Sequence, residues 1–276
     1  MKKILITLII VICSLYMFTA DNKVHKPYLH NNIEEYGVFL STDNQQMAEF
    51  KNYKTIVIDA AYFSKEDIAS LKQDGHKVYS YLNIGSLENF RSYYKEYSKY
   101  TLGKYENWGE EQWVDVSAEE WQELVKKLAK EYEKKGVDGY FIDNCDVYYV
   151  YKQNKIYNGL VKILGELKNS GLDVIINGGD TFAYKYYKDH NTLEGILTGI
   201  NQETVFSSID FEKNRFGFSS KEDRQYFISY LHKMNNAGAV IYLLEYTNDE
   251  KLAKQIKKYC TKNNWKYYIS DSIELD

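Results

Sequence analysis

The sequence contains little cysteine, and this scarcity excludes a small fold held together by disulfides. It has three cysteines in 276 residues, and only Cys145 and Cys260 lie beyond the first 20 residues. Two cysteines do not make a disulfide framework, and neither a CxxC pair nor clustered histidines typical of a zinc site are present. We therefore expect no disulfide network, no metal centre and no cofactor.

Other absences narrow the fold and the function further. No glycine-rich phosphate loop follows the first apolar run, which argues against a doubly wound nucleotide-binding sheet. No Ser-His-Asp arrangement is evident, because none of the five histidines stands at the end of a predicted strand. A formal net charge of −4 argues against nucleic acid as the main partner. No internal repeat or low-complexity linker divides the chain, so we expect one domain.

Only one long apolar run is present, and it lies at the N-terminus. A basic Met-Lys-Lys start is followed by the apolar residues 4–18, a pattern typical of a secretory signal. The run is shorter than the ~20 residues that a stable membrane span needs, but the expected cleavage point lacks the usual small side chain, so an uncleaved anchor stays an alternative. We expect residues 1–20 to be a signal peptide or anchor and residues 21–33 a spacer. The protein would then be exported, either secreted or tethered to the outer face of the cell membrane through this segment alone.

Eight short apolar runs rich in β-branched and aromatic residues follow at intervals, and we predict that each is a strand. Helix-like stretches with apolar residues at three- and four-residue spacing lie between them. Strands that are apolar on both faces and alternate with helices are typical of a parallel barrel. The sequence therefore predicts a (β/α)8 TIM barrel over residues 34–276. The expected strands are residues 37–41, 55–59, 77–85, 139–143, 173–177, 195–200, 239–244 and 266–270.

The clearest predicted helix is residues 117–135. Ser117 and Glu120 have the spacing of a capping box at its start, and Gly136 is placed to end it. The longest stretch without a regular pattern is residues 97–116, whose Trp108, Trp113 and tyrosines make it a candidate cleft wall. The other helices are expected near residues 64–74, 154–170, 221–236 and 249–263.

Polar side chains stand at the carboxyl ends of nearly all the predicted strands. In a parallel barrel these ends form one rim, where barrel enzymes carry out their chemistry. A single strand-end Asp is commonly a helix cap, and Asp146 and Asp271 have that alternative. A whole rim of such residues predicts a cleft lined by carboxylates and amides. The residues concerned are Asp59, Asn83, Ser86, Glu88, Arg91, Asp143, Asn144, Asp146, Asn177, Asn201, Gln202, Glu203, Glu245, Tyr246, Ser270 and Asp271.

Five ordered blocks of these residues span about residues 34–272. They are YLNIG (81–85) with Glu88 and Arg91, DGYFID (138–143) with Asp146, Asn177-Gly178, NQE (201–203) and Glu245-Tyr246. The ordered set resembles glycoside hydrolase family 114, the endo-α-1,4-polygalactosaminidases and their bacterial relatives. The resemblance implies a (β/α)8 barrel, in agreement with the strand count, and hydrolysis of an amino-sugar polysaccharide, α-1,4-linked galactosamine, by a pair of acids.

By this resemblance the two catalytic acids are Asp143 and Glu203. Glu203 is our choice for the general acid because its side chain reaches further. Family members often carry an acid directly after the Ile-Gly of the third strand, where this chain has Ser86. If that acid holds the amino group of the sugar, Asp59, Glu88 and Glu245 could take over that role. The expected substrate-binding residues are Asp59, Tyr81, Asn83, Glu88, Arg91, Asp146, Asn177, Gln202, Glu245 and Tyr246.

Two other functions use the same rim. One is a carbohydrate-binding barrel without hydrolysis, and the other is a polysaccharide deacetylase or another hydrolase. In each case the expected partner is a polysaccharide or oligosaccharide, and the protein is expected to be a monomer. Whether a glycosidase here retains or inverts the anomeric centre depends on the separation of the two carboxyl groups, which the sequence does not give.

Overall fold

The computed structural model describes residues 33–106, 109–213 and 215–276. Nearly all of the expected signal or anchor segment and spacer therefore lies outside the described residues. From Ile33 to Asp276 the chain forms one compact unit. Among the described residues no helix is long and apolar enough to cross a membrane. Cys145 and Cys260 are both buried and free.

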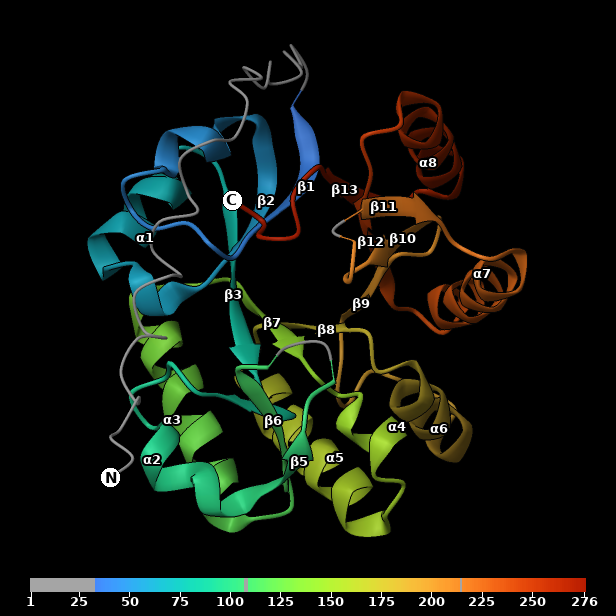
Figure 1. Cartoon of the computed structure of the whole chain (residues 1–276). Helices are drawn as coiled ribbons and strands as arrows, with labels where there is room; N and C mark the ends of the chain where they lie inside the picture. The colour runs from blue at the N-terminus through green and yellow to red at the C-terminus, as the bar shows by residue number, and fades with distance from the viewer. Residues whose placement is uncertain (1–32, 107–108, 214) are drawn as a thin grey trace, which may run out of the picture. The chain divides into compact units, whose positions relative to one another are not determined.

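Eight parallel strands form the central sheet, as the sequence predicted (Figure 1). The first and last strands meet through side chains: Tyr267 donates to Glu34 Oε2 at 3.4 Å, and the rings of Phe39 and Tyr268 lie 5.5 Å apart. The sheet is thus a nearly closed (β/α)8 barrel. In spatial order its strands are β1 (Glu34–Phe39), β2 (Tyr53–Ile58), β3 (Lys77–Asn83), β7 (Gly139–Asp143), β8 (Asp173–Asn177), β9 (Gly199–Glu203), β12 (Val240–Tyr246) and β13 (Lys266–Ser270).

Helices surround the strands (Figure 1). All five predicted helices are present, and a sixth, α6, was missed because its apolar stripe is short and its N-cap is Gly179, which offers no capping side chain. The long helices are α1 (Lys65–Gln73), α3 (Glu119–Lys135), α5 (Asn154–Lys168), α6 (Asp180–His190), α7 (Lys221–Asn236) and α8 (Glu250–Asn263). The short ones are η1 (Met47–Asn52), η2 (Ala60–Tyr62), α2 (Tyr94–Tyr97), η3 (Ser98–Tyr100) and α4 (Val147–Val150).

The capping box predicted for α3 was wrong. The N-cap is Ala118, and both the backbone N–H and the hydroxyl of Ser117 donate to Asp115 Oδ1 instead, at 3.1 and 2.6 Å. The nearby carboxylate is the stronger acceptor for the Ser117 hydroxyl. Gly136 ends the helix in a left-handed conformation, φ +98°, as expected.

Strand alternation divides the apolar residues into two cores. One face of the strands packs against the helices, and the other fills the barrel with large side chains, many of them tyrosines. Tyr36 and Tyr242, for example, lie ring against ring at 4.8 Å. The barrel is therefore a packed interior and not a pore, which leaves its rim as the place for a cleft.

Two small antiparallel sheets extend from the rim. The segment 97–116 is not irregular as predicted: it holds β5 (Thr101–Lys104) and β6 (Glu111–Val114), which pair with β4 (Ser86–Glu88) in the order β4-β6-β5. These strands are too short to show a sequence period. Trp108 lies outside the described residues. The second sheet joins β10 (Ser207–Asp210) and β11 (Arg215–Phe218).

The sixth barrel strand lies later in the chain than predicted. It spans Gly199–Glu203 and not 195–200, so the NQE block forms its carboxyl end. In the same way Glu245 and Tyr246 are the last residues of β12. Because residues 201–203 lie within a strand, their side chains point alternately to the barrel interior and to the helix layer. This alternation decides which of them reach the rim.

Candidate active site

Strand register gathers the polar strand-end residues at one edge of the barrel. Asn83 is the partner of Asp143 between β3 and β7, and Asn177 is the partner of Asn201 between β8 and β9. Glu203 ends β9 beside β12. Residues from four separate segments of the chain thus meet on one rim, as the sequence predicted.

Asp143 and Glu203 lie together because they share a donor. Nδ2 of Asn177 donates to Asp143 Oδ1 at 3.1 Å and to Glu203 Oε1 at 2.7 Å. Because both oxygens bond to the same nitrogen, they lie within about 6 Å of each other. Both residues are half-buried at the carboxyl ends of their strands.

A relay of side chains fixes the orientation of the Asn177 amide. Asn201, fully buried on β9, donates from Nδ2 to Asn177 Oδ1 at 2.7 Å. Its own oxygen accepts from the hydroxyl of Tyr36 at 3.2 Å. With its oxygen engaged, Asn177 must turn its nitrogen toward the two carboxylates. Asn201 stood in a recognised sequence block, but nothing in the sequence assigned it this role.

The surroundings raise the pKa of both carboxyl groups. Burial raises the pKa of Asp143 well above its usual range, and repulsion from Glu111 and Glu203 adds to the rise. Burial also raises the pKa of Glu203, against the opposing effect of the hydrogen bonds from Asn177 and Tyr246. A proton is therefore retained more readily here than on surface carboxylates. Such a pair supplies one protonated acid and one anion.

Arg91 engages two of the acids expected to bind substrate. Its guanidinium donates to Asp59 Oδ2 at 2.7 Å and to Glu88 Oε2 at 2.6 Å, and the three side chains are only 11%, 5% and 6% exposed. Asp59 also caps η2 through the N–H of Ala61. The cluster reaches the rim through Tyr81, whose hydroxyl lies 3.2 Å from Glu88 Oε1 and 3.1 Å from Asp143 Oδ2.

Asp146 supports the loop after β8. Its carboxylate accepts from the N–H of Gly179 at 2.9 Å, and burial raises its pKa to about 6. Gly178 stands at φ +66°, and a Cβ there would lie 2.7 Å from Asp146 Oδ2. The Gly-Gly turn thus lets the loop close over the carboxylate beside Asn177. Asp146 is half-buried and lies at the rim.

Three further predicted residues have different positions. Tyr246 donates to Glu203 Oε2 at 3.1 Å and belongs to the site. Glu245 is fully buried, and its carboxylate accepts from the N–H groups of Phe206 and Ser207, so the structure does not bring it to the cleft. Gln202 is buried, and its Nε2 donates to the Glu203 carbonyl at 3.3 Å, while its Oε1 meets no donor among the residues that the structure describes.

Asn83 shapes the turn that carries the small β4-β6-β5 sheet. Its Oδ1 accepts from the N–H of Ser86 at 3.0 Å, and its Nδ2 donates to the Ser86 hydroxyl at 2.8 Å. Asn144, held at φ +67°, also donates to Asn83 and to Ser86. Asn83 is buried and therefore supports the rim from below.

Sequence reasoning missed Glu111 and Tyr105. Glu111, on β6, accepts from the Ser86 hydroxyl at 2.5 Å. Tyr105 is half-buried and stacks on Trp113, with ring centroids 4.3 Å apart at 27°. Both lie in the stretch that showed no regular pattern, so only its aromatic content hinted at a cleft wall. In the described ranges no group of three His, Cys, Asp or Glu side chains has an arrangement suited to a metal ion.

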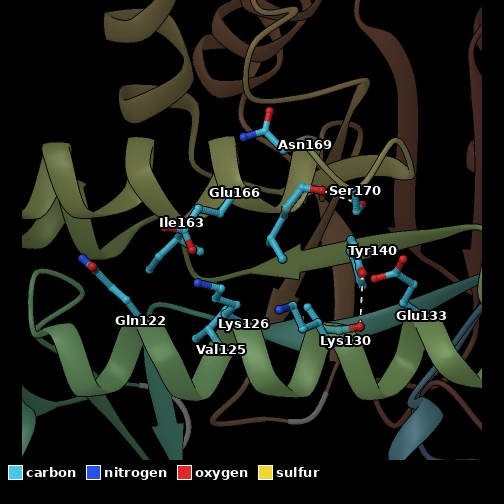
Figure 2. Close-up of a pocket in the computed structure, with 12 residues that line it drawn as sticks. Gln122, Val125, Lys126, Lys130, Glu133, Tyr140, Ile163, Glu166, Asn169 and Ser170 are labelled. Carbon is cyan, nitrogen blue, oxygen red and sulfur yellow. Dashed lines mark hydrogen bonds between the residues drawn. The ribbon is translucent and has the colours of Figure 1, made fainter.

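A second hollow lies away from this rim, between α3 and α5 (Figure 2). Its floor is Tyr140, an outward-facing residue of β7 whose hydroxyl donates to the carbonyl of Ala129 at 3.1 Å. Alkyl groups and lysine stems line much of it. It holds none of the strand-end residues, so the rim is the candidate active site.

Comparison with known proteins identifies the family of the chain. Residues 21–271 match the model of glycoside-hydrolase family GH114. The chain belongs to glycoside hydrolase family GH114. A Thermotoga maritima protein described as uncharacterized is 24% identical over 212 residues, which cover 69% of this chain and 62% of that protein. The matched part is thus less than two thirds of that relative's length.

Solved structures share the fold of this GH114 chain. The glycoside hydrolase domain of PelA from Pseudomonas aeruginosa aligns with a TM-score of 0.76 and 19% identity, over 88% of this chain and 96% of that domain. Aspergillus fumigatus Ega3 in complex with galactosamine aligns with a TM-score of 0.67 and 15% identity, over 88% and 93%. An α-galactosidase of Thermus thermophilus is more distant, with a TM-score of 0.58 and 9% identity, over 86% and 57%. At these identities the likeness concerns the fold.

Proposed function

We propose that this glycoside hydrolase cleaves an amino-sugar polysaccharide, α-1,4-linked galactosamine in particular, with Asp143 and Glu203 as its acidic pair. The observation that carries the proposal is their common hydrogen-bond donor, Asn177, which holds the two bonded carboxyl oxygens within about 6 Å of each other. Glycosidic hydrolysis needs two such groups on opposite sides of the bond. The galactosamine bound to the similar Ega3 structure supports the choice of sugar.

The carboxylate separation favours retention of the anomeric configuration. Retaining glycosidases hold their carboxyl groups ~5–5.5 Å apart, while inverting enzymes need ~6.5–9.5 Å to admit a water molecule. In the proposed mechanism Glu203 protonates the glycosidic oxygen while Asp143 attacks the anomeric carbon, and the bond to the leaving sugar breaks. Glu203 then takes a proton from water, the hydroxide attacks the same carbon, and Asp143 is released.

Hydrogen bonding supports this division of roles. Asp143 accepts from Tyr81, Asn177 and Asn144. Burial and the neighbouring acids raise its pKa, but hydrogen bonds to a carboxylate oppose that rise and favour the anion that a nucleophile requires. Glu203 accepts from Asn177 and Tyr246 only and has the longer side chain, which suits proton transfer to an oxygen beyond the rim. We also propose that the enzyme acts outside the cytoplasm, because its N-terminal sequence has the pattern of an export signal.

Product analysis tests the proposal directly. Protein beginning near Asn31 is incubated with α-1,4-galactosamine polymer, beside the D143N and E203Q variants, and products are read by mass spectrometry. Each substitution should lower turnover by a factor of ~10³ or more while far-UV circular dichroism stays unchanged. A Glu123→Gln variant on the outer face of α3 is the matched control, since its side chain is 70% exposed.

The outcomes separate the alternatives. Short oligosaccharides from the wild type alone, with the anomeric configuration retained in proton NMR, would support the whole proposal. Binding of galactosamine oligomers without products would indicate a non-catalytic barrel, and release of acetate from an acetylated polymer would indicate a deacetylase. Normal turnover by D143N or E203Q would remove that residue from the mechanism.

A further inference from the structure

Glu111 lies next to the catalytic pair although it comes from the small β4-β6-β5 sheet. The register of β4 and β6 sets Glu88 opposite Glu111, which brings the Glu111 carboxylate onto the Ser86 hydroxyl at 2.5 Å. Nδ2 of Asn144 lies 3.4 Å from Glu111 Oε2 and 3.4 Å from Asp143 Oδ2. Glu111 and Asp143 therefore flank one amide, as Asp143 and Glu203 flank another.

The negative charge of Glu111 is not neutralised by an ion pair within the described part of the chain. The cation near this part of the rim is Arg91, and its guanidinium is engaged by Asp59 and Glu88. The groups that donate to Glu111 are neutral: Ser86 and Asn144 reach Oε2, and the amide of Asn83 also bonds to the carboxylate. Burial raises the pKa of Glu111 and repulsion from Glu88 adds to the rise, against the hydrogen bonds it accepts and the more distant charge of Arg91. A half-buried carboxylate without an ion-pair partner costs free energy. A cationic ligand would offset that cost.

An aromatic side chain completes the surroundings of this carboxylate. Tyr105, from the segment between β5 and β6, is half-buried and is supported from behind by its stacking on Trp113. The backbone N–H of Tyr105 donates to the carbonyl of Glu111 at 3.2 Å. Burial raises the pKa of the Tyr105 hydroxyl, and the charges of Asp143 and Glu111 add to the rise. A half-exposed aromatic face beside the reacting groups is a surface on which a sugar ring packs.

From this arrangement we propose that Glu111 binds the protonated amino group of an unacetylated hexosamine in the cleft and so selects free amines over N-acetylated sugars. The inference rests on the proposed function and adds the residue that recognises the positive charge of the substrate. An ammonium group gives Glu111 a charge-assisted hydrogen bond and a counter-ion. An N-acetyl group offers one neutral N–H and no counter-ion, and it places a carbonyl oxygen near the carboxylate.

The test compares two substrates in one variant. E111Q keeps the shape of the side chain and an oxygen to accept from Ser86, but it removes the charge. We expect kcat/KM for α-1,4-galactosamine oligomers to fall about 10- to 100-fold, mainly through KM, with kcat/KM for N-acetylated oligomers nearly unchanged. E110Q makes the same charge change one residue away on an exposed side chain and should leave both values as in the wild type.

A rescue variant separates recognition from a structural role. Ser86 touches Glu111, so an S86D substitution in the E111Q background returns a carboxylate to the same place and should restore the preference for unacetylated substrate. Equal losses on both substrates, or a rescue that fails in a folded protein, would overturn the inference while the proposed function stands.

A binding measurement keeps the two proposals distinguishable. In calorimetry with the free monosaccharides, the wild type should bind galactosamine in preference to N-acetylgalactosamine, and E111Q should lose that preference. If the wild type cuts neither oligomer, the proposed hydrolysis fails, and this preference decides the inference alone. A wild type that binds both sugars equally, or neither, overturns it.

Discussion

Asp143 and Glu203 lie 60 positions apart in the sequence, yet both accept a hydrogen bond from a single nitrogen atom of Asn177. The arrangement limits their separation, because each carboxylate is bonded to the same nitrogen of one rigid amide. It also makes the state of one group sensitive to the other, since a charge on either lies close to its partner.

Loss of this shared donor should impair turnover more than binding. N177A removes a hydrogen bond to each carboxyl group, and bonds to charged groups contribute about 1.5–3 kcal/mol each, so we expect kcat to fall about 10- to 100-fold. N201L, which leaves the Asn177 amide free to rotate, should lower kcat in the same direction by less. Steady-state kinetics on the polymer provide the measurement. Asn169→Ala, exposed at the end of α5, is the control, and wild-type kcat in N177A would contradict the relay.

A pH profile should reveal which acid holds the proton. The Tyr246 hydroxyl donates to Glu203 and lowers its pKa, so Y246F should raise that pKa. If Glu203 is the general acid, the alkaline limb of the kcat/KM profile moves to higher pH, because the group keeps its proton longer.

The same profile can refute the assignment. Movement of the acidic limb alone to higher pH would make Glu203 the nucleophile and Asp143 the acid. The matched control is Y184F, whose hydroxyl lies on the exposed face of α6 and contacts Lys233. Its profile should overlay that of the wild type.

Arg91 should be essential for stability. R91M leaves the nearly buried carboxylates of Asp59 and Glu88 without a counter-charge, and removal of one partner from a buried ion pair costs about 3–5 kcal/mol. Urea denaturation followed by circular dichroism gives the free energy of unfolding. A triple variant with D59N and E88Q should recover part of the loss, because no buried charge then remains.

A surface pair supplies the contrast for that experiment. Lys126→Met breaks a pair with Glu123 in which both side chains are at least 40% exposed, and such pairs contribute less than about 1 kcal/mol. If R91M and Lys126→Met lower the free energy of unfolding equally, the buried cluster stabilises the fold no more than an exposed ion pair does.

Mild acid should stabilise the fold. Burial raises the pKa of Glu245 to about 7 and that of Asp146 to about 6. A raised carboxyl pKa means that the folded state binds the proton more tightly than the unfolded chain, whose carboxyl groups titrate near ~4. Stability from these groups is therefore greatest below ~4 and is lost as pH rises toward 7, at about 1.4 kcal/mol per pKa unit.

Thermal unfolding between pH 5 and pH 8 measures this effect. Tm should rise as pH falls across that window. In E245Q the dependence should be shallower, and Tm lower throughout, because the Gln amide nitrogen meets the N–H groups of Phe206 and Ser207. Carboxyl groups with lowered pKa, such as Asp115 and Asp173, lose their contribution only below this window. A Tm that falls on acidification from pH 8 to 5 would contradict the assignment.

The sequence by itself determined the barrel and the location of its chemistry. Local burial determines the hydrophobic period and the composition of each segment, and both can be read from the sequence. They indicate the eight apolar runs, the amphipathic helices between them and the polar residues after each run. For this reason the strand order, most helices and the rim with Asp143, Asn177 and Glu203 could be predicted. The boundaries of β9 and the start of α3 were missed, because they depend on contacts beyond the local pattern.

Only the tertiary structure decided which polar residues face the cleft and what each one contacts. Glu245 and Glu203 both end apolar runs, yet one is sealed under the loop before β10 and the other is open at the rim. Glu111 reaches Ser86, the position where the family pattern led us to expect an acid, through antiparallel pairing across 25 residues. Hydrogen-bond partners depend on the register between strands, and register comes from the closure and packing of the whole barrel, which no local stretch of sequence specifies.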